Sequence, residues 1–159
     1  MIKDNIKITE GEVIKTQKLW GENIVQIGKL YVEKGNYREH AYNFVKKFYA
    51  YDITNVLFKP TLACTKQFRN TFDDALSYFI GGDIKEDDGF ALKNWDEIRF
   101  GDRNLIIMEK YVVVMGNYYF KSTNEQNEVK AEYTFGYIKN LNGDLVINLH
   151  HSSLPYIKT

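Results

Sequence analysis

The sequence predicts an α+β fold in which three N-terminal helices pack on a strongly curved antiparallel sheet. Two changes of pattern along its 159 residues carry this prediction. Apolar residues recur at helical three- and four-residue spacings up to about residue 82, and after the charged loop DIKEDDG they follow strand-like runs. The aromatic content of 15% also suits half-buried strands. Helices followed by a meander of strands indicate a single α+β domain.

The first helix is predicted to follow a flexible arm at residues 1–10 and to end near Gly35. The remaining residues, 11–159, are expected to form one domain, because a chain of this length is about the size of one typical domain. The apolar stripe of this first helix consists of Val13, Trp20, Ile24, Ile27 and Tyr31.

Two capping patterns predict further helices. Asn36 with Glu39 resembles a capping box and opens the second helix, and Thr71 with Asp74 opens the third. The pair Gly81-Gly82 ends the third helix, because glycine readily adopts the backbone conformation at a helix C-terminus.

Strands are expected around and after these helices. The segment NVLFKPTLA fits an edge strand, since Pro60 cannot donate a ladder hydrogen bond. The later strand-like runs are WDEIRF, NLIIMEKYVVVMGNYYF, EVKAEYTFGYI and DLVINLHHS, separated in part by the turn-like KSTNEQN and NLNGD.

Composition excludes several classes of partner. The 21 basic residues balance 21 acidic ones, so no net charge favours nucleic acid or an anionic membrane. Cys64, the single cysteine, is expected to be a small buried apolar side chain. No apolar run is long enough to cross a membrane, and the charged start does not resemble a signal peptide. We therefore expect a cytoplasmic protein, with a removed leader for the periplasm or an organelle as the alternative.

The segment LVINLHHSS near the C-terminus contains the most distinctive polar cluster. Neighbouring residues of a strand point to opposite faces. Regular alternation therefore predicts that His151 and Ser153 extend the core-facing row of Leu145, Ile147 and Leu149. It places His150 and Ser152 on the other face. Adjacent histidines on opposite faces cannot converge on one metal ion, and the third histidine, His40, lies on the second helix.

By spacing alone, this cluster identifies a pocket and no defined chemistry. The residues His151 and Ser153 could simply satisfy buried backbone groups. A nucleophilic triad is disfavoured, because no carboxylate or elbow turn is marked beside them. The sequence contains no GxSxG, P-loop, GxGxxG or HExxH motif.

Seven phrases taken together resemble the iota-class carbonic anhydrases: KLYVEKGNYREHA, NVLFKPTLA, FRNTFDDALSYFIGG, EDDGFAL, VMGNYYF, VKAEYTFGYIK and LHHSSLPY. They span roughly residues 29 to 156. That group is related to the association domain of calcium/calmodulin-dependent protein kinase II and to the nuclear transport factor two-like fold. The resemblance implies a cone-shaped domain, a homodimer formed through the sheet, and reversible hydration of carbon dioxide to bicarbonate without a metal cofactor.

The resemblance also implies site residues. A threonine, a tyrosine and a serine hold the small anion in metal-free members, and they correspond here to Thr61, Tyr78 and Ser153. His151 is added as a catalytic residue that orients these groups or relays a proton. The choice of Ser153 over Ser152 rests on the alternation of the strand, and a shift of one residue would reverse it.

Several alternatives remain open at this point. Thr61 could satisfy a backbone carbonyl, and Tyr78 could be a core aromatic with its hydroxyl at the surface. A non-catalytic association module would bind a small acid or a peptide. Another enzyme of the same fold would need a pocket base such as Glu132 or Asp73, and a metal-dependent anhydrase would use zinc or manganese.

Two central-strand residues, Asn117 and Tyr133, are further candidates for pocket walls. A cyclohydrolase-like activity is disfavoured, because it calls for a cysteine-rich metal site that the chain lacks.

Overall fold

The computed structural model describes residues 7–159 and begins with two helices of different length. Helix α1 spans Glu10–Val32, and Thr9 caps it in a capping box with Glu12. Helix α2 spans Tyr37–Phe48 and is capped by Asn36, as predicted. Of the predicted arm, residues 1–6 lie outside the described residues, whereas Ile8 is buried.

The segment between α2 and the main strands carries a short strand and the third helix. Strand β1 (Leu57–Lys59) ends directly before Pro60 and lies at the edge of the sheet, as predicted. Helix α3 (Phe72–Ile80) begins after the predicted cap Thr71 and ends at Gly81, whose positive φ of 78° favours glycine. A single 3-10 turn, η1 (Phe90–Leu92), precedes the meander.

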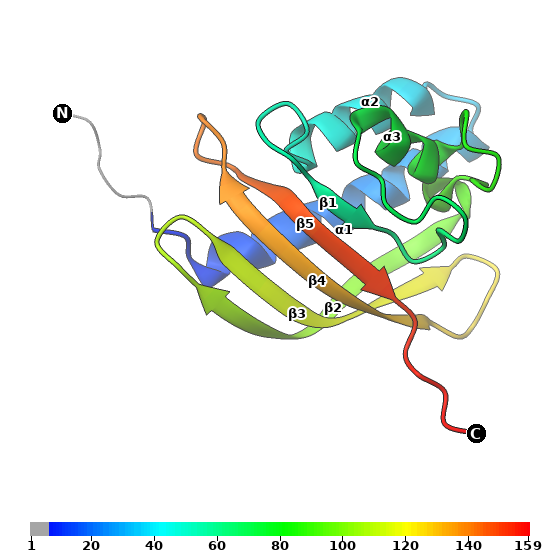
Figure 1. Cartoon of the computed structure of the whole chain (residues 1–159). Helices are drawn as coiled ribbons and strands as arrows, with labels where there is room; N and C mark the ends of the chain where they lie inside the picture. The colour runs from blue at the N-terminus through cyan, green and yellow to red at the C-terminus, as the bar shows by residue number, and fades with distance from the viewer. Residues whose placement is uncertain (1–6) are drawn as a thin grey trace.

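Five strands form one mixed sheet in the order β1-β5-β4-β3-β2. The long strands are β2 (Trp95–Ile107), β3 (Val112–Ser122), β4 (Val129–Lys139) and β5 (Leu145–Ser153). These four pair antiparallel, whereas β1 pairs parallel to β5. The predicted α+β class is confirmed, but the sheet is mixed rather than antiparallel, and it twists without the strong curl that we expected (Figure 1).

The predicted strand runs divide differently from the sequence pattern. The run WDEIRF continues through Gly101 to Ile107 as one strand, which stays paired with β3 on both sides of a register shift between Phe100 and Arg103. The run NLIIMEKYVVVMGNYYF contains a turn, in which the Met108 N–H donates to the Tyr111 carbonyl. Short apolar runs on both sides of such a turn look continuous in sequence.

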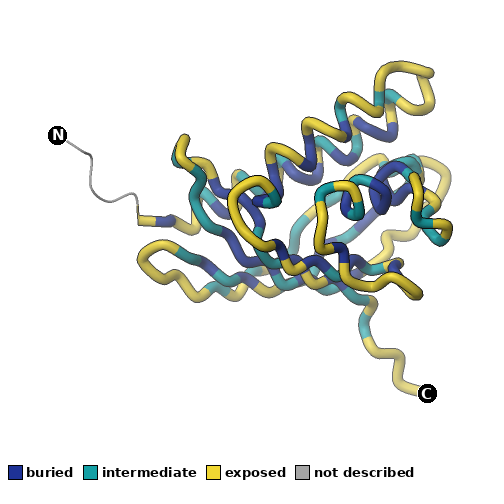
Figure 2. Tube along the Cα trace, turned by 45° about the horizontal axis from the view of Figure 1, so that its top comes forward, coloured by how far each residue is buried: buried dark blue, intermediate teal, exposed yellow. Residues whose placement is uncertain are grey.

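The core lies between the helices and one face of the sheet, and Figure 2 shows the buried parts of the chain gathered there. We call this the inner face and the opposite side the outer face. The α1 residues Val13, Trp20, Ile24 and Ile27 are all at most 2% exposed, as their stripe predicts, whereas Tyr31, the last residue of that stripe, is 45% exposed. Cys64, in contrast, is exposed, so the prediction of a buried thiol is wrong. No helix in residues 7–159 is long and apolar enough to span a membrane.

Candidate functional site

An irregularity in β5 decides which residues of the HHSS segment face the core. Gly136 of β4 pairs with Leu149, and the next β4 residue, Tyr137, pairs with Ile147, so Asn148 is an extra residue. Such a bulge reverses the alternation beyond it. His150 and Ser152 are therefore buried, at 3% and 1% exposed.

The prediction that His151 and Ser153 face the core is therefore wrong. His151 is exposed and Ser153 is half-buried, both on the outer face. The physical reason is the bulge at Asn148, which regular alternation does not anticipate.

Three hydroxyl groups meet at the C-terminal end of β5. The Ser152 hydroxyl contacts Thr61 on one side and accepts a hydrogen bond from the Tyr118 hydroxyl on the other. Thr61 lies in the loop after β1. Strand β1 is held against β5 by parallel pairing, which includes the pairing of Lys59 with His151. Serine and threonine hydroxyls can each donate and accept, so this hydroxyl cluster can bind either water or an oxyanion.

His150 connects this cluster to a second tyrosine. Its Nε2 lies 3.2 Å from the Tyr118 hydroxyl and its Nδ1 lies 3.0 Å from the Tyr49 hydroxyl. The imidazole is stacked between the rings of Phe58 and Phe135, with centroids 4.8 and 4.1 Å away. Burial lowers the pKa of His150 to about 3, with a smaller contribution from His151. This imidazole is therefore neutral at physiological pH.

Tyr78 lies beside the hydroxyl cluster on α3. Its hydroxyl accepts a hydrogen bond of 3.4 Å from the backbone N–H of Leu62, the residue after Thr61. Burial raises the pKa of Tyr78 far above its usual value, so the phenol stays protonated. Tyr78 and Leu62 also line a cavity of about 60 Å³. That is room for about two water molecules, or for one small triatomic or tetra-atomic solute.

Two acidic residues, Glu86 and Asp87, hold the loop that carries Thr61 and the residues that follow it. The Glu86 carboxylate accepts the backbone N–H groups of Cys64, Thr65 and Lys66 at 2.8–3.2 Å. These backbone hydrogen bonds lower the pKa of Glu86. The adjacent Asp87 forms a two-pronged ion pair with the fully buried Arg69, at 2.7 Å for each contact.

The other candidates from the sequence lie away from the hydroxyl cluster. Glu132 lies on the outer face, where it accepts a 3.2 Å hydrogen bond from Ser153, and the Asn117 amide donates to the Ala131 carbonyl. Asp73 lies in the first turn of α3. His40 contacts Asn23, 3.1 Å away.

Tyr133 is buried on the inner face, but its hydroxyl has no hydrogen-bond partner among the described residues. It therefore packs near the site without joining the hydroxyl cluster.

Besides His150 and Ser152, which the predicted alternation placed on the other face, sequence reasoning missed Tyr118, Trp20 and Tyr49. Tyr118 is buried beside Ser152, where the prediction selected its neighbour Asn117, and the alternation of Val112, Val114 and Phe120 along β3 could have identified it. Trp20 and Tyr49 interact at 3.2 Å between the indole N–H and the phenol. Nothing in the sequence pattern distinguishes them from ordinary core aromatics.

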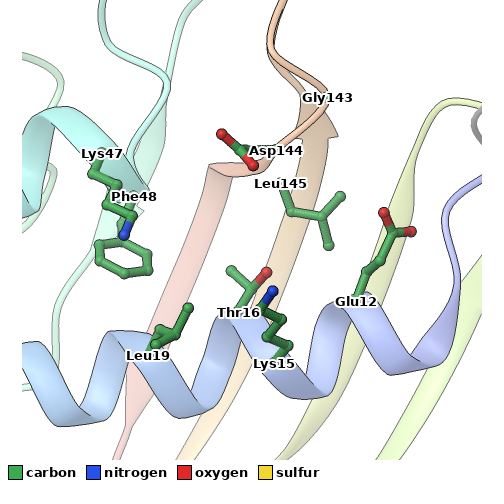
Figure 3. A pocket seen from close by; sticks show the side chains of 9 residues that line it. All are labelled: Glu12, Lys15, Thr16, Leu19, Lys47, Phe48, Gly143, Asp144 and Leu145. Carbon is green, nitrogen blue, oxygen red and sulfur yellow. The ribbon is translucent and has the colours of Figure 1, made fainter.

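The hydroxyl cluster does not line the larger cavities. A cavity of about 310 Å³ lies between α1, the end of α2 and the β4–β5 turn (Figure 3). Its polar side chains include Lys15, Lys47, Glu12 and Asp144, and none of the buried hydroxyl groups. Within residues 7–159, no group of three or more histidine, cysteine, aspartate or glutamate side chains is arranged to hold a metal ion.

The three helices on one face of a five-stranded mixed sheet give the chain a nuclear transport factor 2-like fold. A superfamily member from Salmonella enterica serovar Typhimurium LT2 shares this fold, with a TM-score of 0.58 at 12% identity over 94% of this chain and 92% of that one. A more specific match comes from a family profile, described as metal-independent carbonic anhydrase, that matches residues 11–154 of the chain. The chain belongs to this family, the iota class of carbonic anhydrases.

Two relatives are similar over nearly the whole chain. The metal-independent carbonic anhydrase of Nostoc sp. PCC 7120 is 39% identical, over 96% of this chain and 76% of that protein. The crystal structure of a cyanobacterial iota-carbonic anhydrase complexed with bicarbonate superposes with a TM-score of 0.93 at 35% identity, covering 99% of each chain. The class of enzyme expected from the sequence, a metal-independent carbonic anhydrase, is confirmed.

Proposed function

We propose that Thr61, Tyr78 and Ser152 hold water, carbon dioxide and bicarbonate during the reversible hydration reaction. The observation that carries this proposal is the partly buried contact of the Thr61 and Ser152 hydroxyls, one residue from the hydrogen bond between Leu62 and Tyr78. Ser152 takes the role that the sequence assigned to Ser153, because it shares a face with Thr61. A solved relative that binds bicarbonate supports the same choice of ligand.

The chemistry at this site excludes free hydroxide as an intermediate. Water has a pKa of about 15.7, and His150 is the imidazole nearest the hydroxyl cluster, with a pKa of about 3. Full proton transfer across this gap would cost more than about 15 kcal/mol, at about 1.4 kcal/mol for each pKa unit. His150 therefore acts as a hydrogen-bonding partner of Tyr118, and a role as general base is not proposed.

A concerted reaction avoids that cost. Water held by Thr61 and Ser152 attacks the carbon of carbon dioxide while one of its protons passes to a second water and on to solvent, which leaves bicarbonate. Neutral hydroxyl donors then stabilise the negative charge that develops on the oxygens. The surrounding aromatic rings exclude bulk water, which strengthens these hydrogen bonds.

A stopped-flow assay with a pH indicator tests this function. We expect the purified chain, stripped of metal by a chelator, to hydrate carbon dioxide at the same rate before and after stripping. Metal analysis of the same samples controls for residual zinc or manganese. Activity that disappears with the metal and returns on adding zinc or manganese would contradict the proposal.

A homodimer formed through the outer face is part of the same proposal. Met115 is 56% exposed on this face and lines a shallow cavity with Thr134 and His151. The dimer through this face is what the family resemblance implies, and Met115 is an apolar side chain that such a contact would cover. Light scattering should give twice the chain mass, and Met115→Asp should give the monomer mass. A wild-type monomer would contradict this part.

The cytoplasmic location stays a prediction from the sequence. Fractionation of cells that produce the protein would test it, with enrichment in the cytoplasmic fraction as the expected result.

A further inference from the structure

The hydroxyl cluster is one end of a longer buried hydrogen-bond chain. This hydrogen-bond chain starts on α1 and ends in the loop after β1. Its members, in order, are Trp20, Tyr49, His150, Tyr118, Ser152 and Thr61. All except Thr61 are at most 3% exposed. Bulk water therefore has little access to these groups, and each depends on its neighbours for hydrogen bonds.

The first member fixes the direction of the chain. The indole N–H of Trp20 can only donate, so the Tyr49 oxygen accepts it at 3.2 Å. The Tyr49 proton then has His150 Nδ1, 3.0 Å away, as its partner. If Nδ1 carried a proton instead, the Tyr49 O–H would be left without an acceptor, and a buried unpaired donor costs about 1–3 kcal/mol.

The imidazole passes the same direction of hydrogen-bond donation on to the hydroxyl cluster. With Nδ1 as the acceptor, the single proton of the neutral His150 ring lies on Nε2 and donates to the Tyr118 oxygen. The Tyr118 O–H donates to Ser152, and the Ser152 O–H donates to Thr61. The Thr61 O–H is thereby left as the free donor at the end of the chain.

We propose that Trp20 and Tyr49 are positioning residues that set this direction, so that Thr61 presents a hydrogen-bond donor to the oxyanion. This inference rests on the proposed role of Thr61 in binding bicarbonate. A donor of fixed direction stabilises the charge that develops on bicarbonate without reorganising during the reaction. Without the Trp20 indole, a water in the vacated space could accept the Tyr49 O–H, so the Tyr49 oxygen could accept from Nδ1 and the hydrogen-bond chain could also run in reverse.

The tautomer of His150 reports the direction without relying on activity. NMR spectra that detect two-bond ¹⁵N–¹H couplings in the histidine ring report the tautomer. In the wild type, we expect the His150 ring to carry its proton on Nε2. We expect Trp20→Phe to show both tautomers, and to lower kcat about tenfold with KM within twofold of wild type. Tyr137→Phe is the matched control, since Tyr137 is an equally buried tyrosine outside the hydrogen-bond chain. It should keep the Nε2–H tautomer and the wild-type kcat.

Other outcomes separate this inference from the proposed function. A wild-type Nδ1–H tautomer, or a Trp20→Phe variant with unchanged tautomer and kcat, would overturn the inference. If Trp20→Phe does not fold, Tyr49→Phe replaces it with the same expected results and the same overturning ones. A wild-type enzyme with the Nε2–H tautomer but no hydration activity would overturn the proposed function and leave the direction of the chain intact.

Discussion

The two halves of the HHSS segment have the same chemistry and opposite surroundings. On the inner face, His150 and Ser152 are buried and linked to Tyr118. On the outer face, His151 is exposed and Ser153 hydrogen-bonds to Glu132 at the sheet surface. The comparison shows that residue type alone does not define the site. Burial among aromatic rings, and a hydrogen-bond chain of neutral groups, distinguish the inner pair from the outer pair.

The backbone creates this difference with one residue. The bulge at Asn148 shifts the alternation of β5, so that the second serine and second histidine of the pattern turn outward. The following predictions test the distinction between the faces, starting with the largest effect.

Replacing the inner serine should abolish most of the activity, whereas replacing the outer serine should not. We expect Ser152→Ala to lower kcat/KM for carbon dioxide hydration by about 100-fold or more, because it removes the hydroxyl that links Tyr118 to Thr61 and that leaves Thr61 as the donor to the oxyanion. Ser153→Ala is the matched control and should stay within twofold of wild type. Equal losses in the two variants, measured by stopped flow, would remove the distinction between the faces.

The Thr61 and Tyr78 hydroxyls should follow, with the larger loss at Thr61 because it contacts Ser152. Thr61→Val keeps the shape and removes the hydroxyl, so we expect a loss of about 30- to 100-fold in kcat/KM. Tyr78→Phe removes one neutral hydrogen bond, worth about 1 kcal/mol or about five- to tenfold. Thermal unfolding should stay close to wild type for both. Full activity in either variant would exclude that residue from the site.

The inner histidine should make the fold sensitive to acid. Its folded-state pKa of about 3 lies below the unfolded value of 6.5. The unfolded chain therefore binds the proton first as pH falls, and His150 costs stability between about pH 6.5 and 3. The stabilisation is fully present above pH 6.5. We expect the free energy of unfolding in urea to fall by about 1.4 kcal/mol per unit below pH 6.

His150→Asn should remove this slope even if it lowers the overall stability. An NMR titration in which the His150 ring becomes charged near pH 6.5 in the folded protein would contradict the prediction.

The bulge itself is tested by stability rather than by activity. A Cβ at Gly136 would clash first with the Tyr111 hydroxyl, and it would also lie 2.9 Å from the Leu149 Cβ and 3.0 Å from the Asn148 Oδ1. We expect Gly136→Ala to lower the free energy of unfolding by about 1–3 kcal/mol. Gly11→Ala is the control, because its Cβ would meet only the Thr9 Oγ1 at 3.9 Å, and it should not lose stability. A Gly136→Ala variant as stable as wild type would show that the bulge tolerates repacking.

Much of the fold could be predicted from local pattern, and part of the site could not. Capping residues such as Asn36 and Thr71 act within one helical turn, so the sequence identifies the three helices and their starts. Thr61 and Tyr78 were identified through family motifs. Ser152 was not, because a bulge depends on the pairing of β5 with β4 and leaves no reliable local signal.

The inner hydrogen-bond chain was also beyond sequence reasoning. Trp20, Tyr49 and His150 come from α1, the end of α2 and β5, and only tertiary packing brings their polar atoms together. In sequence each resembles an ordinary core residue, and their exposed fractions of at most 3% agree with that impression. The hydrogen bonds distinguish them.

The position of bicarbonate in crystals of this protein tests the central claim most directly. We predict that soaked bicarbonate binds on the inner face, within hydrogen-bond distance of the Thr61, Tyr78 and Ser152 hydroxyls, without a coordinated cation. Bicarbonate bound on the outer face beside His151 and Ser153, or bound to a metal ion, would contradict the account.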